Sequence, residues 1–375
     1  MGHADRWRSA ALIGAAAGIV VLPVLGGVLF LVVLARSAPV RPGFGGRLAL
    51  ATAAALVLVA HASGPTLPGL VLAGGLAALA PLTHRWSSVA RPGDPAGIAL
   101  GLGIGAAAHG VAALATAQGA PIVGLAAHQN VLGALGALAV PSMIALARGR
   151  PARAWWRWTL VLGVLGVVAA TGSRGAMVAA LAGAAWMAVD AARAVGSPAP
   201  RRSARTWAWV GAVGAVVAVL ALWVGVRQPS SDELLGLTGR TALWGIAVEL
   251  VAERPVLGHG PWAWARLADL VEPSVRAERF PHSHSGYLEL AITYGLVGLA
   301  VVVAYFVSIV HALGRLRTDV WAAAARATWL VFAIVNVGDA FVIDGRFVGL
   351  VVLVSGAAPV PALSPPAPTP PRPTA

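Results

Sequence analysis

Long apolar runs separated by short polar breaks follow one another along most of the chain. At 1.5 Å per residue, the longer runs suffice to cross the ~30 Å hydrocarbon core of a bilayer as helices. The pattern predicts an all-α, polytopic integral membrane protein of eleven or twelve transmembrane helices. The predicted spans are 10–35, 48–62, 67–82, 96–117, 129–147, 157–171, 175–192, 206–226, 286–314, 321–341 and 346–360.

The first run decides the number of spans. As one span it would place Arg6 and Arg8 outside the cell, against the rule that cytoplasmic loops carry the positive charge. Pro23 and the Gly26-Gly27 pair would allow a tight hairpin instead. We favour twelve spans with both chain ends in the cytoplasm.

The breaks between the runs alternate in charge. Those at 62–68, 117–129, 171–175 and 343–346 are nearly free of cations, whereas the intervening five hold sixteen of the 27 basic residues. This alternation predicts that the arginine-rich set faces the cytoplasm. The arginine-rich set consists of Arg36, Arg41, Arg47, Arg85, Arg91, Arg148, Arg150, Arg153, Arg157, Arg193, Arg201, Arg202, Arg205, Arg315, Arg317 and Arg326.

Composition supports the membrane assignment and narrows the chemistry. Hydrophobic residues make up 58% of the chain and charged residues 11%, whereas soluble domains carry about a quarter charged residues. The formal net charge of +13 follows from the cytoplasmic arginines, so we predict no nucleic-acid partner. The absence of cysteine excludes disulfides and thiolate metal sites.

Four regions follow from the pattern. Residues 1–226 form an N-terminal transmembrane bundle, 227–285 an external loop, 286–360 the C-terminal transmembrane helices and 361–375 a disordered, Pro-rich tail.

The external loop contains a predicted amphipathic helix in "GRTALWGIAVELVAERPVLGHG", which Pro255 and the turn at 258–260 would end. Helical spacing places four apolar residues on its buried face, namely Trp244, Ala247, Val248 and Val251. Trp262 and Trp264, which follow, are expected at the membrane interface.

Two arginines on the external side are candidates for binding an anion. Arg174 lies in "TGSRGAMVAA", between two spans, where the amides that begin the next helix also favour an anion. Arg240 begins the amphipathic helix, and its planar guanidinium suits a diphosphate. The alternatives are an arginine reaching the lipid headgroups for Arg174 and an ordinary arginine at a solvated helix end for Arg240.

A third candidate is the cluster in "PHSHSGYLEL", where a span begins. His284 can accept a proton from a hydroxyl near neutral pH, and His282 and Tyr287 lie beside it. A His-x-His metal site lacks an obvious third ligand, so we predict no metal. Glu289 is at i+5 from His284, off the same helical face, which does not favour a role in orienting the histidine. His259 and His282 are weaker candidates for the site, and a structural role is the alternative for each.

A fourth candidate is "AAHQNVLGALGALAVP", where His128 and Asn130 begin a span on the external side. These two side chains either cap the helix or line a polar cavity. Together, the four candidates place cations and a base on one face of the membrane, as is needed to hold a lipid-linked diphosphate while a hydroxyl is activated.

With these motifs in order, the chain resembles the O-antigen ligase and O-antigen polymerase superfamily. The resemblance rests on "HQNVLGALGAL", "SRGAMVAAL", "GRTALWGIAVELVAERPVLGHGPWAW" and "HSHSGYLELAITYGLVGLAVVV", which lie between about residues 128 and 300. The family has an Asn after the histidine where this chain has Ser285.

The resemblance implies a membrane glycosyltransferase of the GT-C kind in the bacterial cytoplasmic (inner) membrane, active on the external side in building the cell envelope. It would transfer a glycan from an undecaprenyl-diphosphate carrier to a glycan or lipid-glycan acceptor, without a metal or another cofactor. Arg174 and Arg240 would bind the diphosphate, and His284 would be the base. Small Ala and Gly faces would let helices pack closely around the carrier's tail.

Two other function classes remain open. A transporter or flippase of lipid-linked sugars also needs arginines, but would favour charges at mid-membrane and repeated halves. A non-enzymatic scaffold would tolerate replacement of Arg174, Arg240 and His284. Ligase, polymerase and protein glycosyltransferase activities are not separated by the sequence.

Overall fold

The computed structural model describes eight stretches of the chain and five further residues. The stretches are 10–17, 94–115, 128–148, 155–194, 238–260, 263–271, 282–314 and 319–343, and the further residues are 347, 350, 351, 354 and 355. The predicted spans 48–62, 67–82 and 206–226, most of 10–35 and 346–360, and the tail lie outside this part. The number of spans therefore stays a prediction.

Within the described stretches every regular element is helical, which confirms the predicted fold class. Five helices are long and apolar enough to cross a membrane, and α7 is a shorter apolar helix. The elements are α5 (Asp94–Ala115), α6 (Gln129–Arg148), α7 (Trp155–Ala170), α8 (Arg174–Ala194), α10 (Thr238–Glu253), α11 (Ala263–Val271), α12 (Gly286–Gly314), α13 (Val320–Gly338) and the 3-10 turn η1 (Phe341–Ile343).

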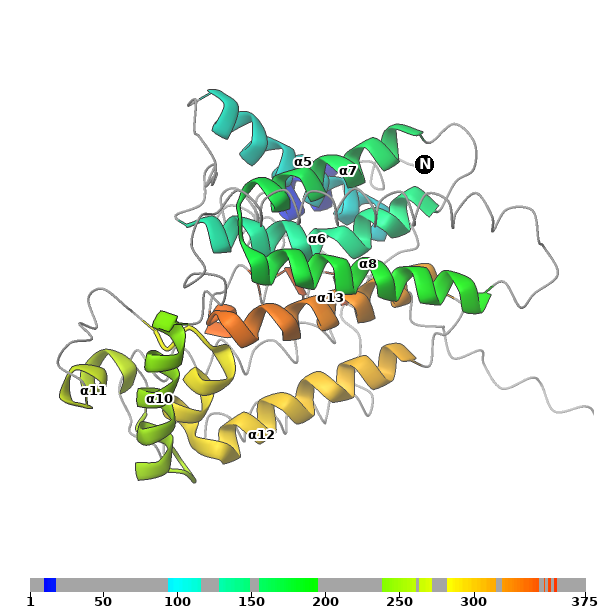
Figure 1. Ribbon diagram of the computed structural model, residues 1–375. Coiled ribbons are helices and arrows are strands. Elements are labelled where there is room, and N and C mark those ends of the chain that lie inside the picture. The colour runs from blue at the N-terminus through cyan, green and yellow to red at the C-terminus, as the bar shows by residue number, and fades with distance from the viewer. Residues whose placement is uncertain are drawn as a thin grey trace, which may run out of the picture.

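Helix α6 lies at the centre of the bundle, in contact with α5, α7, α8 and α13 (Figure 1). Small residues allow these close approaches, as is typical of membrane helices. A Cβ atom at Gly183 of α8 would lie 2.6 Å from Val331 of α13 and 3.2 Å from Pro141 of α6. A Cβ at Gly136 of α6 would likewise lie 2.7 Å from Val168 of α7.

Predicted cytoplasmic arginines lie together at one end of the bundle. Asp190 of α8 pairs with Arg148 of α6 at 3.6 Å and with Arg326 of α13 at 3.4 Å. Arg157 donates to the carbonyl of Leu146 at 2.9 Å. Helices α10 and α11 and the start of α12 lie at the opposite end, on the left in Figure 1.

Helix α12 is broken at Gly295, whose φ of 68° and ψ of −175° are non-helical. The turn after α10 fills the break. His259 and Gly260 donate their backbone N–H groups to the carbonyls of Ile292 (2.8 Å) and Thr293 (3.0 Å). On the far side of the break, the N–H groups of residues 296 and 297 donate to the carbonyls of residues 255 and 256, at 2.7 and 3.3 Å. The turn therefore replaces hydrogen bonds that the break removes. We call this arrangement the brace.

The predicted buried face of α10 is wrong at Val248, whereas Ala247 is buried and Trp244 and Val251 are half-buried. Val248 is 57% exposed, whereas Leu243, Ile246, Ala247 and Leu250 are buried. The stripe differs because α10 packs on α12 and α11, and these neighbours, with Ile292 and Trp264 in the shared cluster, select the buried side.

The expectation that Trp264 lies at the membrane interface is also wrong, because it is 1% exposed and belongs to this cluster. Trp262 lies outside the described residues. The predicted end of α10 is confirmed, since the helix stops at Glu253 and the turn follows.

Candidate functional site

Asp339, the residue that ends α13, is the centre of a polar cluster where several helix ends meet. It is 8% exposed. Its Oδ2 accepts from the Asn130 side-chain amide of α6 at 3.3 Å. Its Oδ1 lies 3.5 Å from Nε2 of His282 and 3.9 Å from Nδ1 of His284. The end of α13, the start of α6 and the segment before α12 therefore meet at one carboxylate.

The backbone around His284 forms a turn, residues 282–285, that precedes α12. His284 has a φ of 54° and is the one non-glycine residue with a positive φ in the described stretches. Its N–H donates to Nδ1 of His282 at 3.2 Å, and its carbonyl accepts from the indole of Trp244 at 3.4 Å. A left-handed, non-glycine residue costs on the order of 1–3 kcal/mol and persists where its surroundings enforce it. Here the hydrogen bond from the His284 N–H to Nδ1 of His282, two residues earlier, is one such restraint.

The start of α12 is fixed by the same cluster. Gly286 donates its N–H to the backbone carbonyl of Asp339 at 3.0 Å. Ser285 precedes the helix, and its hydroxyl accepts from the N–H of Leu288 at 3.5 Å, the position of an N-cap bond. Because Ser and Asn cap helices about equally well, Ser285 can replace the family's Asn in this role.

Burial lowers the pKa of both histidines. For His284, burial is the largest cause and the neighbouring His282 the next; Asp339 opposes them, and the pKa is lowered to about 4. Burial also lowers the pKa of His282, and Asp339 partly offsets it. Both rings are therefore neutral at pH 7. Nδ1 of His284 is buried and lies on the side of the ring that faces Asp339.

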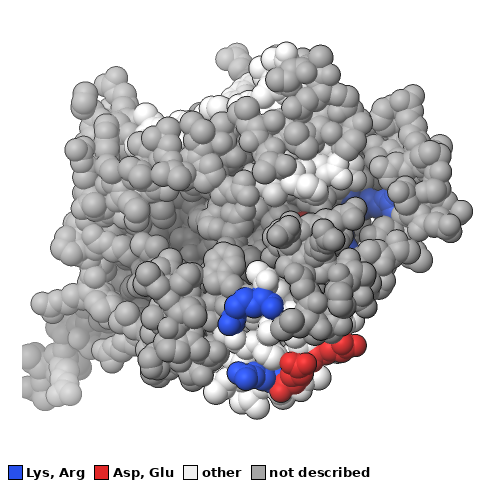
Figure 2. All heavy atoms as spheres, turned by 90° about the vertical axis from the view of Figure 1, so that its left-hand side faces the viewer, with Lys and Arg blue, Asp and Glu red and all other residues white. Residues whose placement is uncertain are grey.

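Arg240 lies beside this cluster. A Cβ atom at Gly338 would lie 3.3 Å from its Nη1, so the guanidinium lies over the residue before Asp339. Its charge contributes to the lowered pKa of both histidines. Figure 2 views this end of the molecule directly, and acidic and basic side chains lie close together at its lower edge.

Arg174 lies at the same end of the bundle, as the first residue of α8. The turn before it packs on the first turn of α6, where a Cβ at Gly133 would lie 2.9 Å from Thr171 Oγ1 and 3.0 Å from Ser173 Cβ. Arg174 itself is exposed. It therefore stands on the helix next to the one that carries Asn130.

The other histidines and the tyrosine named in the sequence analysis each form a hydrogen bond within the protein. His128 caps α6, since its Nδ1 accepts the N–H of Asn130 at 3.1 Å, and it acts electrostatically on both site histidines. Tyr287 donates its hydroxyl to the carbonyl of Ala333 in α13 at 2.9 Å. His259 has a structural role, because its Nε2 donates to the carbonyl of Leu250 at 2.6 Å.

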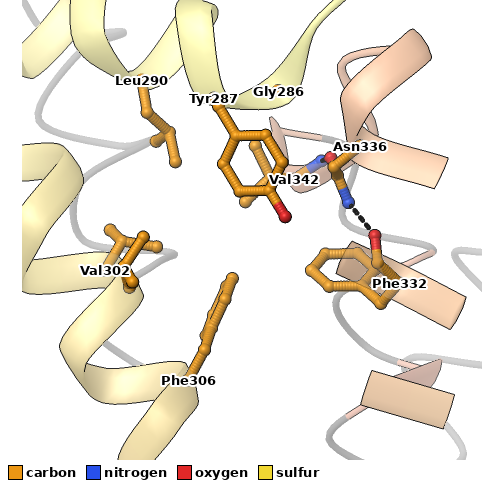
Figure 3. A pocket seen from close by; sticks show the side chains of 9 residues that line it. Gly286, Tyr287, Leu290, Val302, Phe306, Phe332, Asn336 and Val342 are labelled. Atoms are coloured by element: carbon orange, nitrogen blue, oxygen red, sulfur yellow. Dashed lines mark hydrogen bonds between the residues drawn. The ribbon is translucent and has the colours of Figure 1, made fainter. Parts of the chain in front are cut away.

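An apolar pocket lies directly beneath the turn, between α12 and α13 (Figure 3). Tyr287 and Leu290 come from the first arm of α12, Val302 and Phe306 from the second, and Phe332 from α13. The pocket thus occupies the inside of the bend in α12.

Asp339 supplies the third ligand that the sequence did not reveal for a metal site. Ligand atoms of His282, His284 and Asp339 all lie within 4.8 Å of one another. The donor set suits a divalent cation, but the hydrogen bonding opposes it. Because Nδ1 of His282 accepts the N–H of His284, its Nε2 carries the proton and faces Asp339. A metal ligand needs a lone pair there, so a bound ion would have to break the His284 backbone bond.

The sequence pattern does not indicate Asp339, and it does not favour a role for Glu289. Glu289 is 6% exposed and accepts the N–H of Ser283 at 3.1 Å. The i+5 spacing disfavours Glu289 only for a helix that runs through His284, whereas α12 begins at Gly286. The available signal was that acids at the ends of apolar spans are rare and functional by default.

Comparison with protein families finds a similarity in the middle of the chain. Residues 158–303 match the O-antigen ligase family, a stretch that runs from α7 past the brace and includes Arg174, Arg240 and His284. Curated proteins give no match to the chain. The family match and the apolar helices together describe a multi-pass membrane protein with glycosyltransferase-type activity. Over residues 158–303, the chain is therefore similar to the O-antigen ligase family, in agreement with the resemblance of its motifs.

Proposed function

We propose that this protein transfers a glycan from an undecaprenyl-diphosphate carrier to a hydroxyl of a glycan or lipid-glycan acceptor, on the external face of the bacterial inner membrane. The observation that carries the proposal is that Nδ1 of His284 lies 3.9 Å from Oδ1 of Asp339, beside the Arg240 guanidinium. A neutral base and a fixed cation are thereby available within one cluster.

In this mechanism Nε2 of His284 accepts the proton of the acceptor hydroxyl. The acceptor oxygen forms a bond to the anomeric carbon of the glycan, and the bond from that carbon to the phosphate oxygen breaks. The electron pair leaves with the diphosphate. Arg240 and Arg174 stabilise this anion, whose charge on the leaving oxygen grows in the transition state.

The other residues of the cluster position the base. Asp339 faces Nδ1 of His284 and favours the tautomer with the proton on Nδ1, which leaves the lone pair on Nε2. Asn130 holds Asp339, and His282 holds the His284 backbone. His128 and Tyr287 would line the approach of the substrates.

Donor binding would also strengthen the base. The positive charge of Arg240 helps to lower the pKa of His284, so a bound diphosphate that neutralises this charge raises the pKa again. The imidazole would accept a proton more readily only when the donor is in place.

The test is turnover of a lipid-linked oligosaccharide by protein reconstituted in vesicles. We expect His284→Ala to lower kcat about 10²- to 10⁴-fold, the usual contribution of a general base. Arg174→Ala and Arg240→Ala should raise KM for the donor and lower kcat. Arg193→Ala, an exposed arginine at the opposite end of α8, is the control and should behave as wild type.

Retained turnover in all three site variants, at normal expression, would refute the mechanism. A flippase would instead move the lipid-linked sugar across the vesicle without forming a product. A metal chelator should leave the rate unchanged; strong inhibition would mean that His282, His284 and Asp339 hold a cation.

A further inference from the structure

Glu289 is a buried carboxyl next to the site that the proposed mechanism does not use. It lies in the first turn of α12 and is 6% exposed. An ionisable side chain at the start of a membrane span is costly, so its presence calls for a function. Its Oε2 accepts the backbone N–H of Ser283 at 3.1 Å. Glu289 therefore contacts the peptide backbone immediately before His284.

The turn that carries His284 is restrained at the N–H groups of Ser283, His284 and Gly286. The Glu289 carboxylate accepts a hydrogen bond from the N–H of Ser283. Nδ1 of His282 accepts one from the N–H of His284, and the backbone carbonyl of Asp339 accepts one from the N–H of Gly286. The hydroxyl of Ser283 also donates to the carbonyl of Ser285 at 3.1 Å. Since the left-handed conformation of His284 is unfavourable for a residue with a Cβ, these bonds are what keep it populated.

We infer that Glu289 is a positioning residue: its carboxylate oxygen holds the turn so that the ring of His284 faces Asp339. This inference rests on the proposed role of His284 as the base. Glu289 is suited to the task because it belongs to α12, a rigid element, whereas the turn that it holds is non-helical.

The experiment separates the reach of the Glu289 side chain from its charge. Glu289→Gln keeps the length and an acceptor oxygen but loses the charge. Glu289→Asp keeps the charge but is one methylene too short to reach Ser283. Glu289→Leu has similar size and no acceptor. The control is Glu249→Gln, an exposed acid on α10 outside the site.

We expect the Gln variant to retain most of the wild-type kcat, and the Asp and Leu variants to lose about 10- to 100-fold, because a shift of ~1 Å in a catalytic group can cost 10²-fold. KM for the donor should not change, since Glu289 contacts neither arginine. In ¹⁵N spectra of histidine-labelled protein, His284 in the Asp and Leu variants should titrate closer to its ordinary pKa, while the Gln variant follows wild type.

Equal kcat in the Gln, Asp and Leu variants would overturn the inference. An active Asp variant together with an impaired Gln variant would also overturn it, because that result would mean that Glu289 acts through its charge. A loss confined to KM would also overturn it. The proposed function fails separately: it fails if His284→Ala remains active, whatever the Glu289 variants do.

Discussion

The base at the centre of the site depends on residues that are distant in the sequence. His284 is held by its neighbour His282, but its ring faces Asp339, 55 residues further along the chain. Burial within this cluster keeps the imidazole neutral, which a proton acceptor requires. A single histidine on an exposed helix would titrate near its ordinary pKa and would lack a fixed tautomer.

The lowered pKa of His284 predicts a specific pH dependence. Activity should fall as pH falls through this pKa, because the protonated ring cannot accept another proton. With a pKa lowered to about 4 in the free enzyme, the acidic limb of kcat/KM should lie well below pH 6. Measurement of kcat/KM between pH 4 and 8 in reconstituted vesicles checks this.

Asp339→Asn provides the matched variant. Asp339 raises the pKa of His284, so its neutralisation should move the acidic limb to still lower pH, and loss of the oriented tautomer should lower kcat. An acidic limb at or above pH 6.5 in wild type would contradict the prediction.

Among the elements, the broken helix α12 decides the geometry of the site. The break at Gly295 removes the helical partners of several backbone groups, and the brace from the turn after α10 supplies other partners. The same turn fixes α10, which carries Arg240, relative to α12, which follows His284. The glycine-containing turn at 258–260 and the break at Gly295 therefore fit together through these hydrogen bonds. We call this contact the joint.

Gly295→Ala should disrupt this joint. A Cβ there would overlap the carbonyl of Val256, and the positive φ disfavours alanine as well. We expect loss of more than about 3 kcal/mol of stability, since several backbone groups at the break would lose their hydrogen-bond partners. The measurement is the thermal transition of detergent-solubilised protein, followed by size-exclusion chromatography.

Gly245→Ala is the matched control for the same exchange. Gly245 lies within α10 with open space around the added Cβ, so alanine should be neutral or stabilise by up to about 1 kcal/mol through its higher helix propensity. A Gly295→Ala protein as stable as Gly245→Ala would mean that the brace contributes little.

Across the whole molecule, the described charges divide between two ends. The network of Arg148, Asp190 and Arg326 joins α6, α8 and α13 at one end, and the Asp339 cluster lies at the other. If the arginine-rich breaks face the cytoplasm, as the sequence predicts, the site faces outward.

The absence of native cysteine makes this topology directly testable. Two exposed alanines at opposite ends, Ala252 in α10 and Ala192 in α8, form a matched pair for single cysteine substitution. A membrane-impermeant maleimide added to intact cells should label Ala252→Cys at once and Ala192→Cys only after permeabilisation. Labelling of both from the same side would contradict the proposed topology.

The sequence by itself determined the membrane class, the helical fold and the ends of several helices, because hydrophobic length, arginine placement and Pro or Gly stops act locally. It also indicated His284, Arg240 and Asn130 as candidates, since polar residues at the ends of apolar spans are conspicuous. Tertiary structure alone decided that Asp339 joins them, that Glu289 holds the turn and which face of α10 is buried. Those outcomes depend on which helix ends meet in space. They also depend on where α12 begins, after His284, and on its bend at Gly295. The spacing of residues along one segment determines none of these features.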